Sequence, residues 1–166
     1  MSVVAVRILK AGGFQMASDS IVTRGYTKSK GDRSFFAKMV DVDGLVVGSV
    51  GLAEEIGLLT VYAMTRKPEA PTVRAILTYL GEFAEWKQKK INKGGIENSY
   101  LFGFERKIFH SNGWFVEEVR TFEAIGAGED FALAALHLGH DARSAVRVAT
   151  ELSIYCEAPI LVITRR

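Results

Sequence analysis

Short apolar runs separated by glycine turns fill the first fifty positions, which is a pattern typical of paired β-strands. It predicts strands at 3–8 and 14–18 around the turn Ala11-Gly12-Gly13, and at 35–42 and 45–50 around Asp43-Gly44. The polar stretch 21–33 predicts a surface loop or an irregular excursion of a strand.

The pattern then changes to helical spacing. Helices are expected over 52–66 and 72–91, the second fading into lysines as suits a helix C-terminus, with Gly94 and Gly95 ending the pair. Further strands are expected at 99–109, 114–119 and 121–125, with a turn at 111–113. Helices at 129–138 and 142–155, the latter N-capped by Asp141, and a closing strand at 159–164 complete the chain.

This order places strand pairs before helix pairs instead of alternating single strands and helices. It therefore predicts an α+β fold in which helices cover the outer faces of two stacked sheets. With 166 residues, of which 48% are apolar, the chain is long enough for one domain over 1–166.

Composition excludes several classes of function. The chain has 21 basic and 19 acidic residues, and its only dense basic stretch, 87–90, is interpreted as a solvated helix end, so nucleic-acid binding is not expected. A single cysteine, Cys156, rules out an internal disulfide. Because no leader pattern or run of about 18 apolar residues is found, we expect a cytoplasmic protein without membrane contact. No zinc site is expected from His110, His137 and His140.

Ser2 is the strongest chemical candidate. If Met1 is removed, Ser2 carries both a nucleophilic hydroxyl and an α-amine whose ordinary pKa is about 7.7 to 8.0. Such an amine can accept the hydroxyl proton of its own residue, so that no separate histidine is required. The alternative is that a small residue at position 2 only favours removal of the initiator.

Several local motifs occur in the same order as in a known family. They are VVAVR at 3–7, ASDS at 17–20, VGSVG at 47–51, AIGAG at 124–128, ALAAL at 132–136 and a last helix ending in Ile154-Tyr155. With the order of elements, they resemble the proteasome β-type N-terminal nucleophile hydrolases over nearly the whole chain, closest to the bacterial peptidase HslV and its proteasome-like relatives. The resemblance implies the four-layer αββα sandwich of that family.

The resemblance also implies a role for each matched residue. Ser2 corresponds to the nucleophile, Asp19 to the hairpin aspartate, Lys38 to the active-site lysine and Gly51 to the residue whose N–H stabilises the oxyanion. A cation near the amine lowers its pKa, and the aspartate holds that cation in place. The alternatives are a snorkelling lysine at a sheet edge, an ordinary turn carboxylate, and a glycine that permits a sharp turn before a helix.

Two features depart from the family pattern. Ala127 stands where the family has a serine between two glycines, and an ungapped alignment of 3–7 places Met1, not Ser2, on the position of the nucleophile. Two functions therefore remain open. The favoured one is a self-compartmentalising threonine/serine-type peptidase that hydrolyses peptide bonds, and the alternative is a catalytically inactive proteasome-like ring or scaffold subunit.

The resemblance further implies unfolded polypeptide as substrate, a homo-oligomeric double ring, and an ATP-driven unfoldase as partner. No cofactor is required for the chemistry. A structural sodium or other hard cation is expected at the backbone carbonyls of Thr150, Ser153 and Cys156, which match sodium-binding positions in HslV. Carbonyls at i, i+3 and i+6 near a helix C-terminus lie close together and carry negative partial charge. The alternative is a frayed helix end with hydrated carbonyls.

Overall fold

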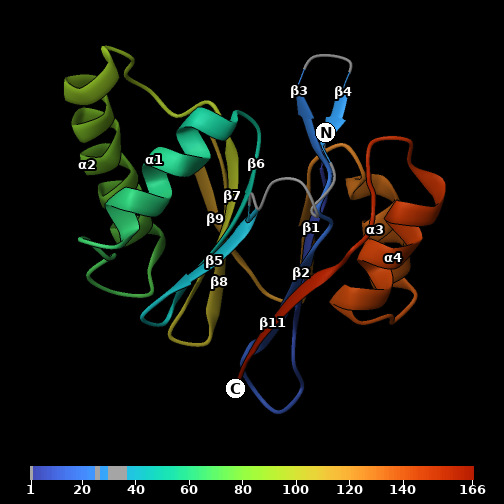
Figure 1. Cartoon of the computed structure of the whole chain (residues 1–166). Coiled ribbons are helices and arrows are strands. Elements are labelled where there is room, and N and C mark those ends of the chain that lie inside the picture. The colour runs from blue at the N-terminus through green and yellow to red at the C-terminus, as the bar shows by residue number, and fades with distance from the viewer. Residues whose placement is uncertain (1, 25–26, 30–36) are drawn as a thin grey trace.

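The computed structural model describes residues 2–24, 27–29 and 37–166, which form two stacked antiparallel sheets with helices on both outer faces (Figure 1). The first sheet has the order β10 (Phe122–Ile125), β1 (Val4–Ile8), β2 (Phe14–Ser18) and β11 (Leu161–Arg165). The second sheet has the order β5 (Met39–Val42), β6 (Leu45–Val50), β7 (Ser99–Phe104), β8 (Lys107–Asn112) and β9 (Phe115–Val119).

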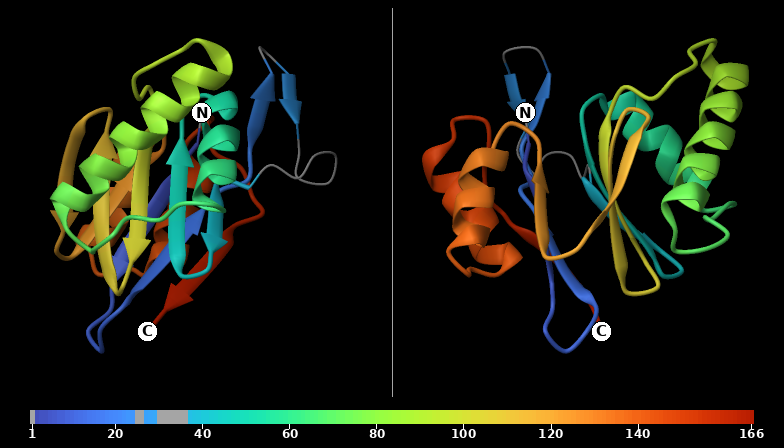
Figure 2. Two further views of the ribbon diagram at one scale, coloured as in Figure 1. Left: turned by 90° about the vertical axis from the view of Figure 1, so that its left-hand side faces the viewer. Right: turned by 180° about the vertical axis from the view of Figure 1, so that it is seen from behind.

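The helices form the outer layers. Helices α1 (Ala53–Ala63) and α2 (Val73–Ile91) cover the second sheet, and α3 (Glu129–His137) and α4 (Ala142–Leu152) cover the first (Figure 2). The predicted α+β sandwich with four layers is confirmed. None of the helices in the described residues is both long and apolar enough to cross a lipid bilayer.

The first strand explains why the N-terminus is central to the packing. Val4 and Val6 on one face of β1 contribute to the core between the sheets, while Val3 and Ala5 pack toward α3 and α4. All four side chains are fully buried. A strand buried on both faces needs a continuous apolar run instead of an alternating one, and the sequence has such a run.

At Gly48 the two sheets leave no room for a side chain. A Cβ on Gly48 of β6 would lie 2.7 Å from Val4 Cγ1 and 2.8 Å from Met16 Sδ, closer than packed atoms approach. Any side chain at this position would therefore push apart the two sheets on which the N-terminal strand depends.

Several predicted boundaries were wrong. The strand expected at 99–109 is a hairpin, β7 and β8, that turns at Glu105 and Arg106, with φ of 47° and 69°. The turn expected at 111–113 begins later, since Ser111 and Asn112 belong to β8. The stretch 21–33 was expected to be a surface loop or an irregular excursion of a strand, and its described part agrees with the second alternative. It contains a two-stranded ribbon, β3 (Val22–Arg24) and β4 (Thr27–Ser29). The strand expected at 35–42 is described only from residue 37, and β5 begins at Met39.

The helix caps follow the sequence more closely. The side chain of Asp141 accepts a hydrogen bond from the Ser144 N–H at 2.8 Å, which confirms the predicted N-cap. The α4 helix ends at Leu152, however, three residues before the predicted end, because Ser153 is already extended with ψ of 127°.

Candidate active site

Asp19 accepts hydrogen bonds from several groups near the N-terminal end of β1. It follows the last residue of β2 and is completely buried. Its Oδ1 accepts hydrogen bonds from the Val3 N–H at 2.9 Å and from Lys38 Nζ at 2.6 Å. Its Oδ2 accepts from the N–H groups of Ile21 at 3.3 Å and Glu157 at 3.2 Å. Asp19 is therefore a structural and electrostatic centre, and not an ordinary turn carboxylate.

Lys38 is the cation that balances this carboxylate. Its side chain is only 3% exposed, so the alternative of a lysine that snorkels at the sheet edge is wrong. Burial lowers the pKa of Lys38, whereas the negative charge and hydrogen bond of Asp19 act to raise it. A buried ammonium is retained only when a carboxylate faces it, and Asp19 supplies that partner.

Ser2 lies directly before Val3, the residue that donates to Asp19. It is 8% exposed, and its carbonyl accepts a hydrogen bond from the Gly128 N–H at 3.2 Å. A Cβ on Gly126 would overlap that same carbonyl. The AIGAG motif therefore packs against the Ser2 backbone, while Met1 lies outside the described residues.

Gly51 follows β6 and has φ of 128°, a value that strongly favours glycine. Its neighbour Val50 contacts the AIGAG loop, since Val50 Cγ1 lies 3.1 Å from the place of a Cβ on Gly126. The AIGAG loop at 124–128 therefore lies against both the Ser2 carbonyl and the end of β6. Hydrogen bonds connect Asp19 to Lys38 and to the residue after Ser2, whereas Gly51 is related to this group only through its neighbour Val50. The positive φ of Gly51 agrees with its alternative role, a sharp turn before a helix.

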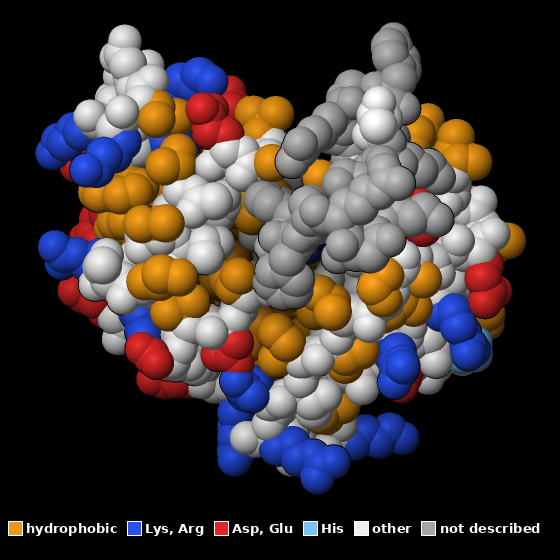
Figure 3. Space-filling view, in the orientation of Figure 1, with side chains coloured by type: hydrophobic (Ala, Val, Ile, Leu, Met, Phe, Trp, Pro, Cys, Tyr) orange, Lys and Arg blue, Asp and Glu red, His pale blue; other side chains and the backbone are white. Residues whose placement is uncertain are grey.

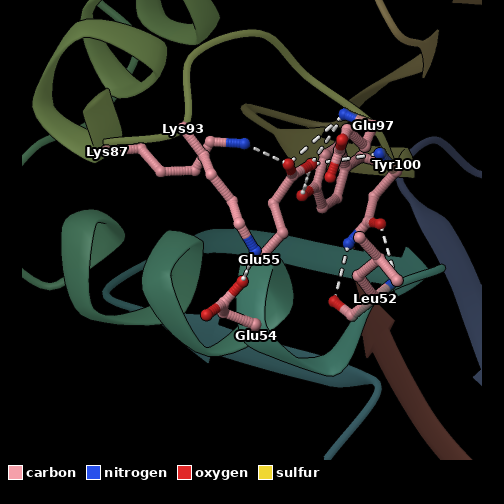
Figure 4. A network of polar contacts seen from close by, with 8 residues as sticks. Leu52, Glu54, Glu55, Lys87, Lys93, Glu97 and Tyr100 are labelled. Atoms are coloured by element: carbon pink, nitrogen blue, oxygen red, sulfur yellow. Dashed lines mark hydrogen bonds and ion pairs between the residues drawn. The ribbon is translucent and has the colours of Figure 1, made fainter. Parts of the chain in front are cut away.

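A second buried polar network, around Glu55, was missed by the sequence analysis (Figure 4). Glu55 and Lys87 form an ion pair with side-chain exposures of 3% and 2%. Tyr100 Oη donates to Glu55 Oε1 at 2.8 Å, and the Asn98 N–H donates to the same oxygen at 3.0 Å. Lys87 was assigned to a solvated helix end, which is wrong because its spacing along α2 points it inward.

The predicted cation site has lost part of its physical basis. Because α4 ends at Leu152, Ser153 and Cys156 are not helical, and the Ser153 carbonyl accepts a hydrogen bond from the Cys156 N–H at 3.2 Å. Thr150 lies on α4 beside a surface cavity of about 730 Å³ that Arg143 and Arg147 also line. The cation at Thr150, Ser153 and Cys156 stays a prediction.

Cys156 packs against Gly128 of the AIGAG loop, close to the candidate site. Its Sγ fills the space where a Cβ on Gly128 would stand, and burial, followed by the charge of Asp19, raises the pKa of the thiol. A raised pKa keeps sulfur protonated and unreactive near neutral pH. Cys156 is therefore a packing residue of the site.

One further group could hold a metal ion. Ligand atoms of His110, Glu117 and Glu123, on β8, β9 and β10, all lie within 4.8 Å of one another. The side chain of Glu117 is 50% exposed, and the group has no direct contact with Asp19 or Lys38 among the interactions of the described residues. No zinc site was expected from the sequence, because His110, His137 and His140 show no ligand spacing with Cys156 or with one another beyond an i, i+3 pair.

The chain matches no protein-family model and no curated protein. Its structure is similar to that of BPH from Thiobacillus denitrificans in complex with epoxomicin, with a TM-score of 0.86 and 21% identity over 98% of each chain. It is also similar to Anbu, an ancestral β-subunit, from Yersinia bercovieri, with a TM-score of 0.72 and 17% identity over 99% of this chain and 81% of that chain. A Gly-1 mutant of Anbu from Hyphomicrobium sp. strain MC1 gives a TM-score of 0.73 at 10% identity, over 100% of this chain and 82% of that chain.

These similarities correct the expected relationship. The expectation that the chain stands closest to HslV is wrong, since the solved structures described above, to which the chain is similar, are those of BPH and Anbu. The motifs used for that assignment are short, and none of them is convincing alone. The chain therefore has the four-layer αββα fold of the proteasome-like N-terminal nucleophile hydrolases.

Proposed function

We propose that the chain is a subunit of a proteasome-like peptidase in which Ser2, made N-terminal by removal of Met1, is the nucleophile. The observation that carries the proposal is the buried Asp19–Lys38 pair, hydrogen-bonded to the backbone of Val3, the residue after Ser2. The similarity to BPH, solved in complex with epoxomicin, supports it. The alternative is an inactive scaffold subunit, which is favoured by Ala127 and by the position of Met1 in the alignment.

The chemistry proceeds through an ester. Ser2 Oγ bonds to the substrate carbonyl carbon while the α-amine takes the hydroxyl proton, and the Gly51 N–H stabilises the oxyanion. The amine then returns the proton to the leaving nitrogen as the C–N bond breaks, and water hydrolyses the ester. Lys38 keeps the α-amine unprotonated through its positive charge, and Asp19 keeps Lys38 in place.

Epoxomicin tests this function directly. After incubation with the purified native chain, intact-mass measurement is expected to show loss of Met1 and addition of one inhibitor, and peptide mapping is expected to place the adduct on Ser2. Ser2→Ala should give no adduct, whereas Thr78→Ala, which removes an exposed hydroxyl on α2, should be labelled like wild type. Retention of Met1 without any adduct would favour the scaffold alternative.

Assembly into a homo-oligomeric double ring is part of the same proposal. Large apolar side chains are exposed on the outer helices or just after them, and the face drawn in Figure 3 shows apolar side chains among charged ones. They include Val61, Met64, Leu138, Leu152 and Ile154. Such surface is commonly covered by a partner.

A double ring would enclose a chamber that admits unfolded polypeptide, and we propose an ATP-driven unfoldase as the partner that supplies it. Light scattering is expected to give a multiple of 18.3 kDa, and a monomer at all micromolar concentrations would contradict assembly.

A further inference from the structure

Helix α1 begins without a cap of its own. The N-cap residue of this helix, Leu52, has no polar side chain. The backbone groups at the start of α1 therefore need hydrogen-bond partners from elsewhere in the chain. The side-chain amide of Asn98, just before β7, does this from 46 residues away. Asn98 Oδ1 accepts from the Leu52 N–H at 2.7 Å, and Asn98 Nδ2 donates to the Leu52 carbonyl at 3.0 Å. One side chain thereby holds both backbone groups of Leu52.

These two hydrogen bonds, called the Asn98 clamp below, hold the peptide group next to the proposed oxyanion donor, Gly51. The peptide group that joins Gly51 to Leu52 contains the N–H that Asn98 binds, and a Cβ on Gly51 would overlap Asn98 Oδ1. Glycine has more backbone freedom than any other residue. An N–H carried by Gly51 therefore keeps one direction only if the groups on both sides are restrained. Val50 on one side is held in β6, and Leu52 on the other side is held by Asn98.

Asn98 is itself held by Glu55, whose buried network is drawn in Figure 4. Its N–H donates to Glu55 Oε1 at 3.0 Å, and Glu55 is paired with Lys87 on α2. Burial acts to raise the pKa of Glu55, but hydrogen bonds from Lys87, Tyr100 and Asn98 outweigh it, so that the pKa lies below its ordinary value. Glu55 is therefore a fixed anion at neutral pH, and it connects α1, α2 and β7 at this point.

We infer that Asn98 is a positioning residue for the Gly51 N–H, held in place by the Glu55–Lys87 pair. The inference rests on the proposed function, because the N–H needs a fixed direction only if it meets an oxyanion. It assigns catalytic importance to a side chain that contacts neither Ser2 nor Lys38 in the hydrogen bonds of the described residues. Oxyanion donors act in the transition state, so their misplacement lowers kcat more than it raises KM.

Peptide hydrolysis by wild type and three variants tests this inference. Asn98→Ala is expected to lower kcat by about 10- to 100-fold, somewhat less than the effect of losing a donor outright, with KM changed by less than about twofold. Asn98→Asp keeps an acceptor for the Leu52 N–H and should be intermediate. Glu97→Gln is the matched control, since only the backbone of Glu97 contacts Glu55, and it should behave as wild type.

Amide hydrogen exchange at Leu52 reports on the Asn98–Leu52 hydrogen bonds independently of peptide hydrolysis. In Asn98→Ala the Leu52 N–H is expected to exchange at least about tenfold faster, while amides of the β-sheets keep their protection. Rapid exchange with unchanged kcat would overturn the positioning role while leaving the proposed function intact. A wild-type chain that neither hydrolyses peptide nor reacts with epoxomicin would overturn both the function and the role inferred from it.

Discussion

Replacing Lys38 with Met is expected to abolish epoxomicin labelling of Ser2 and to lower the free energy of unfolding by about 3 to 5 kcal/mol. The substitution leaves Asp19, which is completely buried, without its cation. Three backbone N–H groups still donate to the carboxylate, but none carries a charge. Urea denaturation gives the change in stability, and intact mass gives the labelling.

The double variant Asp19→Asn/Lys38→Met separates stability from chemistry. Removing both charges eliminates the unpaired carboxylate, so part of the lost stability should return, whereas labelling should stay absent because no cation faces the amine. Labelling of Lys38→Met at the wild-type rate would show that Lys38 has no part in the reaction.

The pH dependence of stability provides a second check on Lys38. Its pKa in the folded chain lies below the ordinary value of 10.5 because burial disfavours the charged form. Between those two values the unfolded chain binds more protons than the folded chain, so the free energy of unfolding should rise with pH across this window. In Lys38→Met this contribution should disappear.

The elements predicted best have strong local signals. The hairpin around Ala11-Gly12-Gly13, the turn at Asp43-Gly44 and the N-cap at Asp141 depend on residues only a few positions apart. The turn at Glu105 and Arg106 was missed because neither residue is a usual turn former, although both have positive φ. The sheet pairing in the structure, and not the sequence pattern, determines that turn.

The site was predictable only in part for the same reason. Ser2 was selected from its chemistry, and Asp19, Lys38 and Gly51 from the family resemblance. Hydrogen bonds connect Asp19 with Lys38 and with the residue after Ser2. Asn98 was missed because its partners are Leu52 and Glu55, more than forty residues earlier. The relationship to HslV was inferred wrongly from short motifs, whereas the similarity to BPH and Anbu extends over nearly the whole fold of this chain.

Replacing Glu55 with Gln is expected to destabilise the chain by about 3 to 5 kcal/mol, because it leaves the buried ammonium of Lys87 unpaired. The adjacent Glu54 is the matched control. Its ion pair with Lys93, at 3.0 Å, is formed by exposed side chains that water already solvates, so Glu54→Gln should leave stability unchanged within error. Chemical denaturation of both variants makes the comparison.

The double variant Glu55→Gln/Lys87→Met tests whether the buried charges serve only stability or also hold Asn98 in position. A neutral glutamine can still accept hydrogen bonds from the Asn98 N–H and from Tyr100, and the introduced methionine side chain fills most of the lysine volume, so stability should largely return. If the charges serve only the fold, slow Leu52 exchange and peptide hydrolysis should return with it. If the anion is needed to hold Asn98, stability recovers while the Leu52 N–H exchanges rapidly and kcat remains low. We expect the second result, because a hydrogen bond from the Asn98 N–H to a carboxylate is stronger than one to a neutral amide.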